Sequence, residues 1–109
     1  MSSQHVTELN DATFDTFLAS TTKPVLVDFW APWCGPCRAL GPVVEEVATE
    51  NSDKFAVAKV NVDDAPTVST THGIRSIPAL FFFKDGVKKD SVVGVQGKAE
   101  ILRRLEALV

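Results

Sequence analysis

Two cysteines separated by two residues, Cys34 and Cys37, lie where a predicted strand turns into a predicted helix. The apolar run 25–30 precedes them, and apolar residues at helical spacing follow as far as about residue 50. Cα atoms three positions apart at the start of a helix are about 5–6 Å apart, a separation that a disulfide tolerates. At the cap position, Cys34 would face the unpaired N–H groups and the positive end of the helix dipole, which favour a thiolate. The pattern is typical of a redox-active dithiol beside a strand–helix–strand unit.

The size and composition of the chain limit its class. Its 109 residues suit one domain with a real core, and 45% hydrophobic and 23% charged residues are ordinary for a soluble globular protein. The net charge of −3 argues against nucleic acid and anionic membranes as partners. The longest apolar run, 78–83, is too short to cross a membrane, and residues 1–6 lack the basic start and apolar centre of a signal peptide. We therefore expect a single domain over residues 1–109 in the cytoplasm, where two cysteines indicate catalysis or metal binding before a structural disulfide.

The remainder of the chain alternates segments with strand and helix patterns. Strands are predicted at residues 6–9, 25–30, 55–62, 79–83 and 87–93. Helices are predicted after Asn10 or Asp11, from Cys34 to about Glu50, from near Pro66 to Gly73, and after Gly97. Asp85-Gly86 indicates a tight hairpin, which makes the sheet mixed. The expected fold class is α/β, a central mixed sheet of about five strands with four helices on its two faces.

Several residues within these elements have predictable structural roles. Pro42 lies inside helix 34–50 at a cost of about 3 kcal/mol or more, so a bent helix is expected because the apolar period continues past it. Asp63 or Asp64 is expected to cap the helix near Pro66. The run 81–83 and Trp30 are assigned to the core, and His5 and His72 have no evident catalytic partner.

The segment 27–37, Val-Asp-Phe-Trp-Ala-Pro-Trp-Cys-Gly-Pro-Cys, resembles the active-site signature of the thioredoxin family. The similarity covers essentially the whole chain at matching spacing, and includes Pro42, 59–63, 73–78, 83–86 and Gly94. The departures are Arg38 where many relatives have lysine, Pro32 where some have an acidic residue, and Gln96-Gly97 after the glycine loop. The resemblance implies the thioredoxin fold and an enzyme that reduces disulfides in client proteins.

The resemblance also implies an order of events for the two cysteines. Cys34, the nucleophile, would attack a client disulfide and form a mixed disulfide; Cys37, the resolving thiol, would then release the client and close a reversible Cys34–Cys37 disulfide. Only Cys34 needs to be exposed, and Cys37 should be shielded. Gly35-Pro36 is the dipeptide of thioredoxins and favours a reductant. The alternatives are a permanent disulfide, which would remove little unfolded-state entropy, and half of a metal site, with only His5 and His72 as further ligands. No bound metal is expected.

Asp28 is a carboxylate inside the apolar run 25–30. Desolvation in a central strand would raise its pKa and keep it partly protonated near neutral pH, so that it can exchange a proton with Cys37. The alternative is an idle aspartate at a frayed strand end. Lys59, alone among apolar neighbours, either modulates this carboxyl group or simply extends from the sheet to solvent.

A docking surface for clients is also expected. Pro78 in trans would merely start a strand, whereas the resemblance implies a cis Ile77–Pro78 bond that places Ile77 beside the cysteines. An extended client segment would then pair with the free backbone groups there. For Trp33 the alternative is a core position. The residues expected to bind substrate are Trp33, Gly35, Pro36, Ile77, Pro78, Gly94 and Val95.

No cofactor is expected besides the Cys34–Cys37 disulfide itself. Because the chain has no Gly-x-Gly-x-x-Gly motif, NADPH would supply electrons only indirectly, through a separate thioredoxin reductase. The expected partners are this reductase and disulfide-containing client proteins, and the protein is expected to be a monomer. Two other functions remain open at this point: an oxidase or isomerase of another compartment, and a binding module that uses the apolar face around Trp33 without redox turnover.

Overall fold

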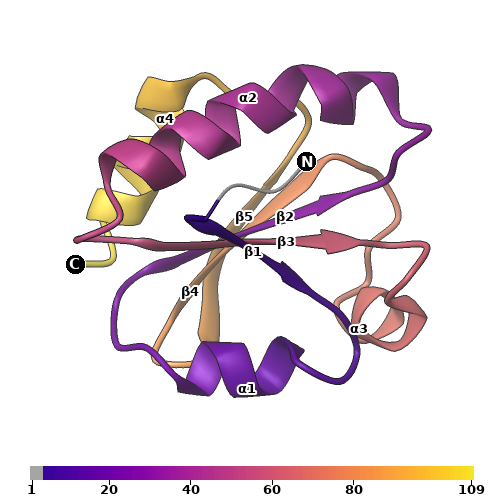
Figure 1. The fold of residues 1–109 in the computed structure, drawn as a ribbon, viewed down its shortest axis with the longest axis horizontal. Coiled ribbons are helices and arrows are strands. Elements are labelled where there is room, and N and C mark those ends of the chain that lie inside the picture. Colours follow the sequence, from indigo (N-terminus) through magenta and orange to yellow (C-terminus); the bar gives the residue numbers. More distant parts are fainter. Residues whose placement is uncertain (1–3) are drawn as a thin grey trace.

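A five-stranded sheet with helices on both faces forms the centre of the computed structural model, which describes residues 4–109 (Figure 1). The strands are β1 (Val6–Leu9), β2 (Val25–Trp30), β3 (Ala56–Asn61), β4 (Ala79–Lys84) and β5 (Val87–Val93). The helices are α1 (Phe14–Ala19), α2 (Gly35–Glu50), α3 (Pro66–Thr71) and α4 (Lys98–Glu106). The predicted α/β class and order of elements are confirmed. Residues 1–3, the start of the segment judged unlike a signal peptide, lie outside the described residues.

The strands lie in the order β1-β3-β2-β4-β5. The first three are parallel, β4 runs antiparallel to β2, and β5 runs antiparallel to β4. The antiparallel part thus begins one strand earlier than the hairpin alone indicates. The reason is that the chain leaves β3 and re-enters the sheet at the same end, where Ala79 at the start of β4 pairs with Phe29 near the end of β2. The carboxyl ends of β2 and β3 and the start of β4 therefore meet at one edge of the sheet.

Alternate residues of the strands supply two hydrophobic cores, one on each face of the sheet. Helices α1 and α3 cover one face and helices α2 and α4 the other (Figure 1). Val27 and Phe29 of β2 belong to the α1/α3 face, whereas Leu26 belongs to the α2/α4 face. Because side chains alternate along a strand, Asp28 also points to the α2/α4 face.

The helix caps differ from those expected. The carboxylate of Asp11 accepts hydrogen bonds from the backbone N–H groups of Thr67 and Val68, at 3.2 and 2.8 Å, in the first turn of α3. The prediction that Asp63 or Asp64 caps this helix is therefore wrong, since the loop before α1 lies against its start and supplies the carboxylate instead. The N-cap residue of α1 is Thr13, and Asn10 closes the preceding turn by accepting from the N–H group of Thr13 at 3.1 Å.

Two other local predictions are confirmed. Asp85 and Gly86 both have positive φ, 54° and 79°, as a tight β4–β5 hairpin requires. Helix α2 continues through Pro42, whose side chain is exposed, as the unbroken apolar period predicted, and the bend at Pro42 stays a prediction. None of the helices in residues 4–109 is both long enough and apolar enough to cross a membrane.

Candidate active site

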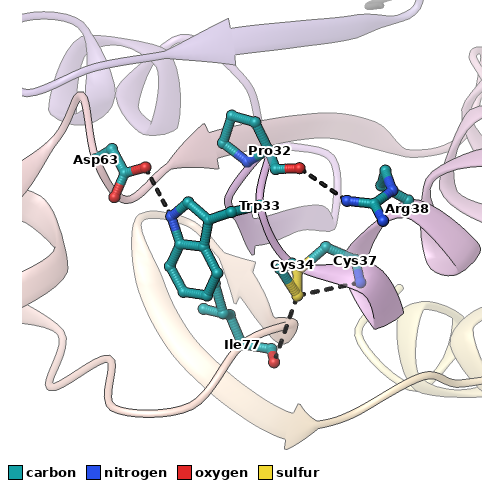
Figure 2. The surroundings of a disulfide bond; sticks show 7 residues. All are labelled: Pro32, Trp33, Cys34, Cys37, Arg38, Asp63 and Ile77. Carbon is teal, nitrogen blue, oxygen red and sulfur yellow. Dashed lines mark hydrogen bonds between the residues drawn. A yellow bond between two sulfur atoms is a disulfide. The ribbon is translucent and has the colours of Figure 1, made fainter.

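Cys34 and Cys37 are joined by a disulfide at the start of α2 (Figure 2). Their Cα atoms are 5.2 Å apart, a separation that disulfides commonly span. Cys34 is the N-cap residue of the helix, with extended backbone angles, and its Sγ accepts a hydrogen bond from the backbone N–H of Cys37 at 3.2 Å. The same N–H and the helix dipole would stabilise negative charge on Cys34 once the disulfide is reduced.

Both cysteines are covered in this disulfide form. Cys34 is 6% exposed and Cys37 is 3% exposed, because Ala31 and the partly buried Ile77 pack against the pair. The predicted shielding of Cys37 is confirmed, but the predicted exposure of Cys34 is wrong for this state. On the Ile77 side, the Cys34 Sγ lies 3.9 Å from the Ile77 carbonyl oxygen (Figure 2).

Two contacts hold the loop that precedes the cysteines. The indole N–H of Trp33 donates a hydrogen bond to Asp63 Oδ2 at 2.9 Å, and the ring is 66% exposed (Figure 2). The guanidinium group of Arg38 donates to the backbone carbonyl of Pro32 at 3.0 Å. The alternative of a core position for Trp33 is thereby excluded, and the Arg38 departure from the family pattern ties the first turn of α2 to this loop.

Four of the other residues expected to bind substrate, Ile77, Pro78, Gly94 and Val95, lie where β4 begins and β5 ends. The Ile77–Pro78 peptide bond is cis, and the carbonyl of Pro78 accepts a hydrogen bond from the N–H of Gly94 at 2.8 Å. Gly94 has a φ of +99°, a conformation that other residues rarely adopt. Val95 is exposed, as are Gly35 and Pro36 beside the cysteines, whereas Pro78 itself is buried.

Asp28 is buried on the α2/α4 face, with 4% of its surface exposed. Burial raises the pKa of its carboxyl group to about 7, and the positive charge of Lys59 opposes that rise. Its Oδ1 has no hydrogen-bond partner among residues 4–109. Asp28 and Cys37 line one cavity of about 290 Å³ together with Lys59. A carboxyl group that holds or releases a proton near neutral pH therefore shares a cavity with the second cysteine.

The sequence model of the family described as Thioredoxin matches residues 5–107. The chain belongs to the thioredoxin family. It is 51% identical to thioredoxin 1 of Synechococcus elongatus over 98 residues, which are 90% of this chain and 92% of that protein. It is 48% identical to thioredoxin of Mycobacterium tuberculosis over 102 residues, 94% of this chain and 88% of the relative. Against the chloroplastic M-type thioredoxin of Pisum sativum the identity is 46% over 101 residues, 93% of this chain but 59% of the relative.

The thioredoxin assignment agrees with the site, because the cysteine pair is the thiol–disulfide oxidoreductase centre of this family. The metal alternative has no support: residues 4–109 hold no group of three or more His, Cys, Asp or Glu side chains able to share an ion. His72 in particular lies on the opposite face, with its ring centroid 5.0 Å from that of Phe14.

Two residues of this thioredoxin site have contacts that their sequence context did not indicate. Asp63 was expected to cap a helix but accepts the hydrogen bond of Trp33. Trp30 was assigned to the core, yet it is only partly buried, lines the cavity of Asp28, and carries the ammonium group of Lys59 over its ring. No motif or periodicity connects either pair, because each contact joins side chains from different elements.

Proposed function

We propose that this thioredoxin-family protein reduces disulfides in client proteins through Cys34 and Cys37. The observation that carries the proposal is the position of Cys34 Sγ at the N-cap of α2, where the N–H of Cys37 already donates to it. An electron-rich sulfur at this position is the nucleophile that thiol–disulfide exchange requires.

In the proposed reaction the Cys34 thiolate attacks one sulfur of the client disulfide, and the other client sulfur leaves as a thiolate. Cys37 then loses its proton, attacks Cys34 Sγ and expels the second client sulfur. The client gains two electrons, and the two cysteines lose them as their disulfide forms. Asp28 is the proposed acceptor of the Cys37 proton because the two side chains line the same cavity and burial brings the pKa of Asp28 to about 7.

Client binding is assigned to the surface around the disulfide. The exposed side chains of Trp33 and Val95 supply apolar contact area, and the backbone of Ile77 offers groups to which an extended client segment can add. Gly35, Pro36, Pro78 and Gly94 complete the proposed set; Gly94 permits close approach because it has no Cβ.

The proposed function also implies a redox partner, a cellular compartment and an oligomeric state. A separate thioredoxin reductase would return electrons from NADPH, since this sequence has no Gly-x-Gly-x-x-Gly motif with which to bind a dinucleotide itself. We propose that the protein works in the cytoplasm, as a monomer of one domain, because its cysteines must be kept reduced and the surface around Trp33 must stay open to clients. Cell fractionation and analytical ultracentrifugation test these two points.

Two single mutants with one client disulfide test the cysteine roles. Cys37→Ser should accumulate a covalent mixed disulfide with the client, because the first step proceeds and the second cannot. Cys34→Ser should form no adduct and show no turnover. Mass spectrometry of the non-reduced mixture measures the adduct, and trapping by Cys34→Ser instead would reverse the assignment. A variant without both cysteines that retained activity would favour the binding-module alternative.

A further inference from the structure

The charged group of Lys59 lies over an aromatic ring and not on the neighbouring carboxylate. Asp28 and Lys59 are direct partners across the parallel pair β2–β3, so their side chains leave the sheet side by side. Nevertheless no ion pair joins them in the part of the chain that the structure describes. The Lys59 Nζ instead lies 5.0 Å from the ring centroid of Trp30, within the range of a cation–π interaction.

Trp30 is suited to hold this lysine. It stands two residues after Asp28 on the same side of β2, so its indole adjoins the cavity that Asp28, Cys37 and Lys59 line. Its Nε1 is buried and has no hydrogen-bond partner among residues 4–109, like the Oδ1 of Asp28. The partly buried ring thus presents its face to the ammonium group, while its N–H lies at the buried side.

We infer that Trp30 is a positioning residue, which holds the ammonium group of Lys59 over its ring, near the Asp28 carboxyl group, and keeps it from returning to water. The inference rests on the proposed role of Asp28 and deepens it. A contact ion pair would fix Asp28 as a carboxylate, and a lysine released to solvent would leave it protonated. A lysine held between these extremes lets the carboxyl group take up and release a proton as Cys37 reacts.

The other charged groups around the cavity do not replace Lys59 in this role. Arg38 and Glu45 of α2 also line it, but the Arg38 guanidinium donates to the Pro32 carbonyl. Burial is the main cause of the raised pKa of Asp28, and Lys59 is the one charge that opposes it. Displacing the Lys59 ammonium group from the ring should therefore raise the pKa of Asp28.

The experiment follows the titration of Asp28 by carbon-13 NMR of its carboxyl group in the disulfide form, in which neither cysteine titrates. Trp30→Leu should raise the midpoint in the same direction as Lys59→Met and by no more than that variant does, because the freed ammonium group returns to water. In the Lys59→Met background, Trp30→Leu should add no further shift. Trp33→Leu, the same change at the other tryptophan, should leave the midpoint in place.

A second readout is independent of Asp28. The ε-methylene protons of Lys59 should be shifted upfield by the ring current of Trp30 in the parent protein and should lose this shift in Trp30→Leu. If Trp30→Leu does not fold, Trp30→Phe, which retains a weaker ring, should give a smaller rise of the Asp28 midpoint. An unshifted Lys59 resonance, an unchanged or lowered midpoint, or an equal effect of Trp30→Leu without Lys59 would each overturn the inference. Since neither readout uses turnover, these outcomes are distinct from a failure of the proposed reductase activity.

Discussion

The two faces of the sheet are built from the same strands but differ in the side chains that pack there and in the ionisable group that each one holds. The α1/α3 face is an aromatic cluster: Phe29 lies 5.1 Å from Phe81 and Phe14 lies 5.9 Å from Phe83, measured between ring centroids. His72 packs on the same rings. The α2/α4 face is mainly aliphatic, yet it encloses the carboxyl group of Asp28.

The difference shows which face stabilises the fold and which carries the chemistry. On the α1/α3 face, burial and the charge of Lys88 lower the pKa of His72, and a neutral imidazole packs well on phenylalanine. On the α2/α4 face, Asp28 retains an oxygen without a hydrogen-bond partner among the described residues, which costs stability. The destabilising carboxyl group lies in the cavity that Cys37 also lines, which is where the proposed proton transfer needs it.

The largest expected effect tests the aromatic face. Phe14 is 2% exposed and contacts Phe29, Phe83 and His72, so Phe14→Ala should lower the free energy of unfolding by about 3–5 kcal/mol. Denaturant unfolding at pH 7 measures the loss, and Phe14→Leu should lose less because more of the volume remains. The titration of Asp28 should not change. A loss below about 1 kcal/mol would contradict the stabilising role of this face.

The next effect concerns Asp28→Asn and depends on pH. The pKa of Asp28 is about 7 in the folded protein, against an ordinary value of 3.8 for an aspartate in water. As the pH rises, the unfolded chain therefore loses this proton at a lower pH than the folded protein does. The stability of the parent protein should fall as the pH rises from about 4 to 7 and then level off. The asparagine variant lacks this slope and should be more stable by about 4 kcal/mol near pH 8.

The same Asp28→Asn variant should also slow the release of clients, because Cys37 loses its proton acceptor. Stopped-flow kinetics with a model disulfide measure this step. Asp53→Asn, at an exposed turn, is the matched control and should leave the rate unchanged. Unchanged kinetics in Asp28→Asn would remove Asp28 from the mechanism, whatever the stability shows.

A smaller effect is expected at the cap of α3. Asp11→Ala removes the acceptor for the N–H groups of Thr67 and Val68 and should cost about 0.5–2 kcal/mol. Asp64→Ala, at the exposed position that the sequence suggested for the cap, should have almost no effect on the denaturation midpoint. Equal losses of stability in the two variants would show that the hydrogen bonds from α3 to Asp11 do not stabilise the fold.

The smallest effect is expected at His72 and has the opposite sign to that of Asp28. Because burial lowers the pKa of His72 in the folded state, its contribution to stability is full above its ordinary value of 6.5 and is lost as the pH falls below it. His72→Phe should therefore lose less stability than the parent protein between pH 7 and pH 5. Thermal unfolding at the two pH values measures the difference. Identical losses of stability in the two proteins would mean that protonation of His72 does not destabilise the aromatic face.

Features that depend on neighbours along the chain were predictable from the sequence. The apolar run of β2, the helical period of α2 and the Asp85-Gly86 turn each predicted their element. The cysteine pair was predictable because both residues lie within one helical turn, so their separation follows from helix geometry. The burial of Asp28 was predictable for the same reason, since a strand that is apolar on both sides is covered on both faces.

What the sequence alone determined is therefore the set of elements, the two sulfur atoms and the buried carboxyl group, because these follow from local periodicity and from the chemistry of single side chains. The contacts between distant residues came only with the packed fold: Asp11 caps a helix at Val68, 57 residues away, and Asp63 accepts a hydrogen bond from Trp33, 30 residues before it. The same holds for the position of Lys59 on Trp30 and for the covering of Cys34 in the disulfide form. These contacts depend on which strands become neighbours, and the order β1-β3-β2-β4-β5 is a property of packing that no local pattern contains.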